Sequence, residues 1–158
     1  IQRYELNKNS RVLDISAKKG FFMHDLSLLV PGITVYGIED HKYPIKKSMK
    51  SIKKNIKFVN SYCDIKFKKN YFDFVHAHNA IYRYSFKDLI EIIKIISKIS
   101  KKAHITIPAY SNSNDRLKFL DWSLHGSVHL KKHEWRQLFN ELGYDGDYYF
   151  SGAKSYGL

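Results

Sequence analysis

The hydrophobic pattern of the first forty residues predicts a strand, a helix and a second strand. An apolar run covers residues 12–15, and a polar turn over residues 16–20 follows it. Apolar residues at spacings near three and four then mark an amphipathic helix over residues 21–30. A Pro-Gly break separates this helix from a second apolar run over residues 33–38. This order and length are typical of the first βαβ unit of a nucleotide-binding sheet.

The same alternation continues to the end of the chain. Strands are predicted at 56–59, 71–75, 103–107 and 144–150, the second of which runs on into residues 76–79. Helices are predicted over 85–100, 116–123 and 132–142, and Pro44 opens a further helix with Ile45, Met49 and Ile52 on its apolar face. Alternating strands and helices predict an α/β fold with a mostly parallel central sheet and helices on both faces.

Length and composition narrow the class of protein. A chain of 158 residues is predicted to form a single domain, and a hydrophobic content of 44% excludes a disordered chain. No apolar run approaches the ~18–20 residues of a membrane span. The lone Cys63 excludes an internal disulfide, and no signal peptide is visible, so we expect a cytoplasmic location. The chain begins at Ile1 rather than Met, which leaves open a missing N-terminal segment.

The charge of the chain raises the question of a nucleic-acid partner. The formal net charge is +12, from 27 Lys and Arg against 15 Asp and Glu. Only five of these basic residues are Arg, although phosphate recognition favours the bidentate Arg fork. A surplus of Lys, Ile and Asn also follows from A+T-rich coding without any function. Composition alone therefore does not favour nucleic acid as the partner.

Five motifs occur in the order in which one enzyme family carries them: VLDISAKKGFF, YGIED, SYCDI, NYFDFVHAHNAIYRY and HITIPAY. On these motifs the chain resembles the class I S-adenosylmethionine (SAM)-dependent methyltransferases from about Arg11 to Phe150. The resemblance implies the Rossmann-like methyltransferase fold and SAM as cofactor. That fold has seven strands, whereas this chain ends near the sixth, so we expect the last strand to be missing or unrecognised.

The resemblance also implies a set of cofactor-binding residues. Glu39, at the end of the second strand, stands where the family's acid holds the SAM ribose, and Asp64 stands near the expected position of the adenine amino group. The further candidates lie on the first motif and the fourth strand: Asp14, Ser16, Gly20 and His76. The residues by themselves leave other roles open, because Asp14 and Asp64 also suit turn formation and Glu39 also suits a surface acid.

The first motif departs from the family pattern. The family's loop is rich in glycine because its backbone adopts positive φ angles close to the cofactor. Here Ser16, Ala17 and Lys18 stand at these positions, and Lys18 is bulky and cationic. This departure leaves open a catalytically inactive relative that works through protein contacts.

Candidate residues for chemistry follow the fourth strand. His78 is the candidate general base, because imidazole titrates near neutral pH, and Asn79 beside it completes the candidate catalytic pair. Tyr82 and Arg83 are candidates for the acceptor pocket, where Arg83 suits a carboxylate or phosphate. No metal site is predicted: the histidines at 125, 129 and 133 recur at intervals of four, but Gly126 and Val128 interrupt a helix between them.

These observations give one first prediction and two alternatives. The first is SAM-dependent methyl transfer to a small-molecule acceptor or to a sugar or lipid precursor. The alternatives are an inactive methyltransferase-fold subunit and an RNA-binding methyltransferase. The sequence leaves a protein partner and a homodimer open, and fold likeness does not identify the acceptor.

Overall fold

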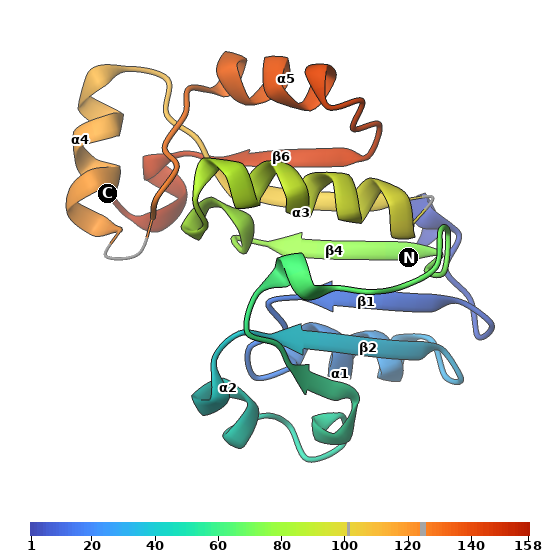
Figure 1. The fold of residues 1–158 in the computed structure, drawn as a ribbon. Helices are drawn as coiled ribbons and strands as arrows, with labels where there is room; N and C mark the ends of the chain where they lie inside the picture. Colours follow the sequence, from blue (N-terminus) through green and yellow to red (C-terminus); the bar gives the residue numbers. More distant parts are fainter. Residues whose placement is uncertain (101, 124–125) are drawn as a thin grey trace.

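The computed structural model describes residues 1–100, 102–123 and 126–158, and Figure 1 shows their arrangement. Within these residues, six strands form one sheet in the order β3-β2-β1-β4-β5-β6, and every neighbouring pair is parallel. The strands are β1 (Arg11–Ile15), β2 (Thr34–Glu39), β3 (Ile56–Phe58), β4 (Phe74–His78), β5 (Ala103–Pro108) and β6 (Asp147–Ser151).

Helices cover both faces of this sheet, as the alternation of elements predicts. The α-helices are α1 (Phe21–Leu29), α2 (Lys42–Lys46), α3 (Phe86–Ile99), α4 (Ser113–Trp122) and α5 (Lys132–Glu141). Short 3-10 helices lie at η1 (Gln2–Tyr4), η2 (Lys53–Asn55), η3 (Tyr62–Asp64), η4 (Ile81–Arg83) and η5 (Ala153–Tyr156). In Figure 1, α3 lies in front of the sheet and α1 behind it.

Two buried clusters hold the layers together. Successive residues of β1 alternate between them, so Leu13 and Ile15 pack on the α3 side while Val12 packs on the α1 side. The amphipathic stripe of α3 faces the larger cluster, and all five of its predicted core positions are at most 1% exposed: Leu89, Ile92, Ile93, Ile96 and Ile99. Trp135 of α5 joins the same cluster. Hydrophobic burial on both faces therefore fixes the sheet between its helices.

Four predicted elements differ from the structure. α4 begins at Ser113 rather than at residue 116, and β6 begins at Asp147 rather than at residue 144. The helix that Pro44 was predicted to open begins two residues earlier, at Lys42, and ends at Lys46. It ends there because the Ser48 hydroxyl donates to the Ile45 carbonyl and the Met49 amide donates to the Lys19 carbonyl, outside the helix. The fourth strand begins at Phe74 rather than at residue 71, since Phe72 makes only an isolated bridge with Ser100. The prediction that this strand runs on past residue 75 is confirmed.

Because the strands are parallel, their carboxyl ends meet at one edge of the sheet, on the left in Figure 1. β1 pairs with β2 on one side and with β4 on the other, so the chain reverses its direction of strand addition here. Ligands of open α/β sheets bind at such a switch point. No helix of the described residues is long and apolar enough to cross a membrane.

Candidate functional site

The turn between β1 and α1 adopts the backbone conformation that glycine usually supplies. Ser16 has φ 65° and Lys18 has φ 53°, so two non-glycine residues are left-handed within three positions. Gly20 is also left-handed, and a Cβ there would lie 2.1 Å from the Ile52 side chain. Gly20 is therefore required by its φ angle and by packing, whereas Ser16 and Lys18 hold the same kind of conformation at an energetic cost.

Glu39 joins this turn to the tip of β2. Its side chain is 2% exposed, and its Oε2 accepts the Lys18 amide at 2.8 Å while its Oε1 accepts the His41 amide at 3.1 Å. Burial raises the pKa of Glu39, and the bond from the Lys18 amide opposes this shift. The acid thus lies at the predicted place and already binds two backbone amides. A carboxylate offers about four acceptor positions in all.

The next residue, Asp40, is the centre of a network that sequence reasoning missed. Its carboxylate accepts the Tyr62 hydroxyl at 3.0 Å, the Tyr84 hydroxyl at 2.8 Å and the Arg83 Nη2 at 3.2 Å. His41 Nδ1 lies 2.8 Å from the same carboxylate. Burial raises the pKa of Asp40, but bonds from Tyr84 and His41 and the Arg83 charge outweigh burial and lower it well below its usual range. The network ties β2 to the segment after β4.

On β1 and β4, Asp14 and His76 form a pair one strand apart. His76 Nδ1 lies 3.0 Å from Asp14 Oδ1, and the His76 ring stacks on Phe22 with 4.2 Å between ring centroids. Burial is the main cause that raises the pKa of Asp14, and His76 opposes it. Two cofactor-binding candidates are thus brought together, with Asp14 orienting the imidazole.

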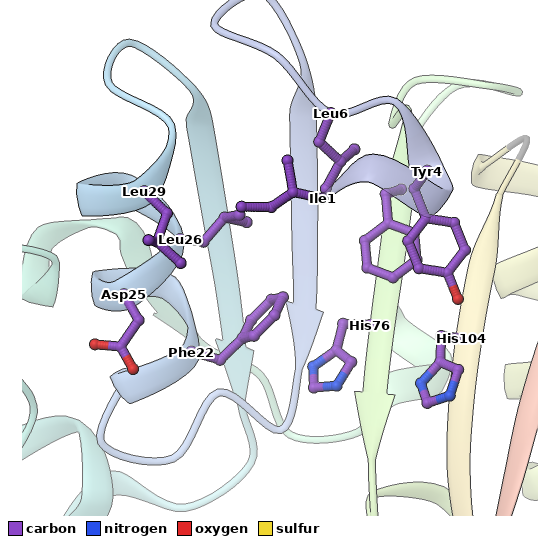
Figure 2. Close-up of a pocket in the computed structure, with 10 residues that line it drawn as sticks. Ile1, Tyr4, Leu6, Phe22, Asp25, Leu26, Leu29, His76 and His104 are labelled. Atoms are coloured by element: carbon purple, nitrogen blue, oxygen red, sulfur yellow. The ribbon is translucent and has the colours of Figure 1, made fainter.

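This pair borders a mostly apolar pocket of about 320 Å³, shown in Figure 2. Phe22 and Leu26 of α1 form one wall, and Tyr4 of η1 lies across from them. His76 and His104 lie side by side on the sheet face, with 6.1 Å between ring centroids. Sequence reasoning did not identify this pocket, because η1 and α1 are brought together only by the sheet.

His78 and Asn79 lie at the carboxyl end of β4, as predicted. His78 shares a face with His76, at 6.0 Å between ring centroids. Partial burial and the nearby His76, Lys18 and His104 lower the pKa of His78. Asn79 has φ 50°, and its buried Oδ1 has no hydrogen-bond partner among the described residues. The His78 imidazole and the unpaired Asn79 Oδ1 therefore belong to neighbouring residues at the carboxyl edge of the sheet.

The other predicted residues have different surroundings. Arg83 directs its Nη2 to Asp40, while its Nε and Nη1 make no hydrogen bond within the described residues. A hollow of about 390 Å³ beside it is lined by Asp40, His41, Asn60, Arg83 and Tyr84. Tyr82 lies in the larger core cluster at 8% exposure. Asp64 caps η3 by accepting the Ser61 amide at 3.2 Å, which is the turn-forming alternative.

The histidines at intervals of four do not form a group in the described part of the chain. His125 lies outside the described residues, and His129 Nε2 is 3.2 Å from the Gly126 carbonyl. Ligand atoms of Glu39, Asp40 and His41 lie within 4.8 Å of one another, but the hydrogen bonds given above account for this cluster.

A parallel sheet with switch-point order, an acid at the tip of β2 and a left-handed turn after β1 together define a Rossmann-like α/β domain. Within that class, the methyltransferase domain family matches residues 6–144. The chain belongs to this family. No curated protein sequence matches the chain.

Solved structures show the same fold. A complex between the Haloferax volcanii Trm112 methyltransferase activator and a candidate methyltransferase is similar, with TM-score 0.70, 16% identity and coverage of 90% of this chain and 64% of the other. A SAM-dependent methyltransferase from Archaeoglobus fulgidus has a TM-score of 0.70 and 18% identity, and the match covers 85% of this chain and 60% of the other. The YcgJ protein from Bacillus subtilis has a TM-score of 0.67 and 18% identity, and the match covers 89% of this chain and 64% of the other. The chain therefore spans less than two thirds of these structures.

Proposed function

We propose that this chain binds SAM at the carboxyl edge of β1, β2 and β3 and transfers its methyl group to an acceptor over the ends of β4 and β5. The acceptor is a small molecule or a sugar or lipid precursor. Membership of the methyltransferase family supports the reaction class. The acceptor class rests on the resemblance of residues 134–150, EWRQLFNELGYDGDYYF, to the last helix and following strand of small-molecule methyltransferases.

The observation that carries the proposal is the strained turn after β1. Left-handed Ser16 and Lys18 each cost free energy, and the bond from the Lys18 amide to Glu39 holds the second of them in place. Strain of this kind persists where a site requires the conformation. The turn thus keeps the shape of a nucleotide-binding loop without its usual glycines.

The described residues fit the cofactor and an acceptor. Glu39 has acceptor capacity left for ribose hydroxyls, and Asp14 orients the His76 imidazole. The Asn79 Oδ1, which has no hydrogen-bond partner among the described residues, would accept a hydrogen bond from a hydroxyl or amine of the methyl acceptor. Bound SAM would supply an electrophilic methyl group.

The protein's own chemical step is the removal of a proton. His78, neutral because its pKa is lowered, would accept the proton that the acceptor hydroxyl loses as its oxygen is methylated. Asn79 would hold that hydroxyl in line. Arg83, through Nε and Nη1, would bind a carboxylate or phosphate of the acceptor in the hollow beside Asn60.

Calorimetric titration with SAM and with its demethylated product, S-adenosylhomocysteine, tests the proposal. We expect both to bind the folded chain with micromolar affinity. Absence of binding at millimolar ligand, with folding shown by circular dichroism, would contradict the proposal. Acceptor screening by methyl transfer from labelled SAM would follow a positive result.

One observation favours the inactive-subunit alternative. Glu39 is 2% exposed and each of its oxygens already binds a backbone amide, so ribose hydroxyls would reach its remaining acceptor positions only after the surrounding residues move. A protein activator, of the kind solved with the Haloferax volcanii relative, would be one way to supply that movement. Titration with SAM in the presence of a co-purifying partner separates this case from permanent inactivity.

A further inference from the structure

The positive charge of the chain is concentrated in one segment, residues 42–69. This segment has ten Lys and one acid, Asp64, whereas the rest of the chain has 17 basic and 14 acidic residues. Nine of the twelve net charges therefore come from 28 residues. Coding bias that favours lysine would spread it along the chain, so it does not explain this concentration.

The structure places this charge on the surface, and we name these residues the lysine-rich edge. All ten side chains are exposed, and within the described residues none of them forms an ion pair: Lys42, Lys46, Lys47, Lys50, Lys53, Lys54, Lys57, Lys66, Lys68 and Lys69. By contrast, Lys102 pairs with Glu5 at 2.6 Å. The field of the lysine-rich edge is therefore not neutralised locally.

The lysine-rich edge follows the outer side of the sheet. Five of its lysines lie on α2, η2 and the end strand β3, and the other five lie in the segments that follow α2 and η3. α2 follows the carboxyl end of β2, and η2 leads into the amino end of β3. The lysines are therefore distributed from the carboxyl end of the strands to their amino end. A single lysine on β3 would suffice to protect an edge strand from pairing with another chain.

Two exposed aromatic side chains lie among the lysines of the lysine-rich edge. Tyr43 is 68% exposed and Phe58 is 36% exposed. Lys42 Nζ lies 5.1 Å from the centroid of the Phe58 ring, so a cation and a ring are already held together. Aromatic faces among lysines are the arrangement on which unpaired bases stack while lysines neutralise phosphates.

We propose that the lysine-rich edge binds single-stranded nucleic acid, with Tyr43 and Phe58 stacking against bases and the lysines contacting the backbone. The absence of arginine from residues 42–69 indicates recognition of backbone charge rather than of base edges. The exposed rings favour unpaired bases over a duplex, in which base faces are already stacked. This binding goes beyond methyl transfer and does not depend on SAM being bound.

Fluorescence anisotropy with a labelled oligouridine of about 15 nucleotides tests the surface directly. The substituted protein carries Lys46→Gln, Lys47→Gln and Lys50→Gln on and after α2. A matched control carries Lys87→Gln and Lys94→Gln on α3 and Lys154→Gln on η5, which are also exposed and change the net charge equally. We expect binding to weaken about tenfold or more in the first protein and less than twofold in the control.

Salt dependence gives a second readout. Each lost phosphate contact lowers the slope of log affinity against log salt by about 0.7 for a single strand, so three losses should lower it by about 2. Tyr43→Ala should weaken binding several-fold and leave the slope unchanged, because stacking releases no counterions. Tyr149→Ala is the control, since Tyr149 is 58% exposed on β6 at the opposite edge of the sheet.

Several outcomes would overturn the proposal. Equal losses in both triple variants would show attraction by net charge alone. Tighter binding to duplex of the same length, or to vesicles with anionic lipid, would assign the surface to a different partner. No binding at about 50 mM salt would remove it altogether. Since the assay contains no SAM, none of these results depends on the proposed methyl transfer.

Discussion

The backbone amide of Lys18 donates to Glu39 Oε2 at 2.8 Å, and this bond connects the turn after β1 with the tip of β2. The two groups come from neighbouring strands, paired from Arg11 with Thr34 to Ile15 with Ile38. Lys18 makes this bond from a left-handed conformation, so its backbone matters here and its exposed side chain does not. A lysine can therefore occupy a position that usually needs glycine.

Lys18→Gly should stabilise the chain. A left-handed backbone costs a residue with a Cβ about 1–2 kcal/mol, and glycine gives back about 0.5–1 kcal/mol through its freedom in the unfolded chain. We expect a net gain of about 0.5 kcal/mol in the free energy of unfolding, measured with urea. Lys19→Gly is the control, because Lys19 is exposed but not left-handed, and it should cost about 0.4–1 kcal/mol. Destabilisation by Lys18→Gly would show that its side chain has a structural role.

Glu39→Ala should loosen the turn and weaken the proposed cofactor site together. Removing the carboxylate leaves the Lys18 and His41 amides without their partner, which costs about 1–3 kcal/mol of stability. SAM binding should weaken by a similar amount, and hydrogen exchange at the Lys18 amide should accelerate. Glu91→Ala, which removes an exposed acid on α3, should change none of these three quantities. Faster exchange with unchanged SAM affinity would assign Glu39 to the turn alone.

Most of the fold could be predicted because local periodicity decides it. The stripe of α3 identified five residues that are all buried, from Leu89 to Ile99. The start of β4 could not be predicted in this way. Residues 71–75 are apolar enough for a strand, but the pairing with β1 begins only at Phe74. Apolar pattern reports burial, and strand pairing is decided by the neighbouring strand.

The site was predictable only in part. Glu39 was found because a strand ends there, whereas Asp40 was not, because its partners Tyr62 and Tyr84 are 22 and 44 residues away. Arg83 was expected to face an acceptor, and the structure shows that it also pairs with Asp40. No local spacing in the sequence links Tyr62 or Tyr84 to Asp40, because only the fold brings them together.

Asp40→Asn should destabilise the chain in a pH-dependent way. Since the folded-state pKa of Asp40 lies below its unfolded value of about 4, its contribution is present above about pH 4 and is lost as the pH falls toward the folded pKa. We expect a loss of about 2 kcal/mol at neutral pH, because Arg83 and Tyr84 lose a charged partner. The difference from the unsubstituted chain should shrink in acid.

Urea unfolding at several pH values measures this dependence, and Asp121→Asn is its control. Asp121 is exposed and makes no hydrogen bond or ion pair through its side chain within the described residues, so its substitution should be close to neutral at every pH. A loss that stays constant from neutral pH into acid would show that the side chain matters for packing rather than for charge.

His78→Gln should abolish the acid limb of the pH–rate profile, provided that methyl transfer occurs. Partial burial, with His76, Lys18 and His104 nearby, lowers the pKa of His78 below its usual value of about 6.5. The rate should therefore rise with pH through this lowered pKa and be level above it, because only neutral imidazole accepts a proton. Loss of a general base reduces the rate about 10²–10⁴-fold.

His133→Gln, on the exposed side of α5, should leave the profile unchanged. SAM affinity measured by calorimetry should be the same in both variants, and a rate loss that keeps the acid limb would assign His78 to positioning instead of proton transfer.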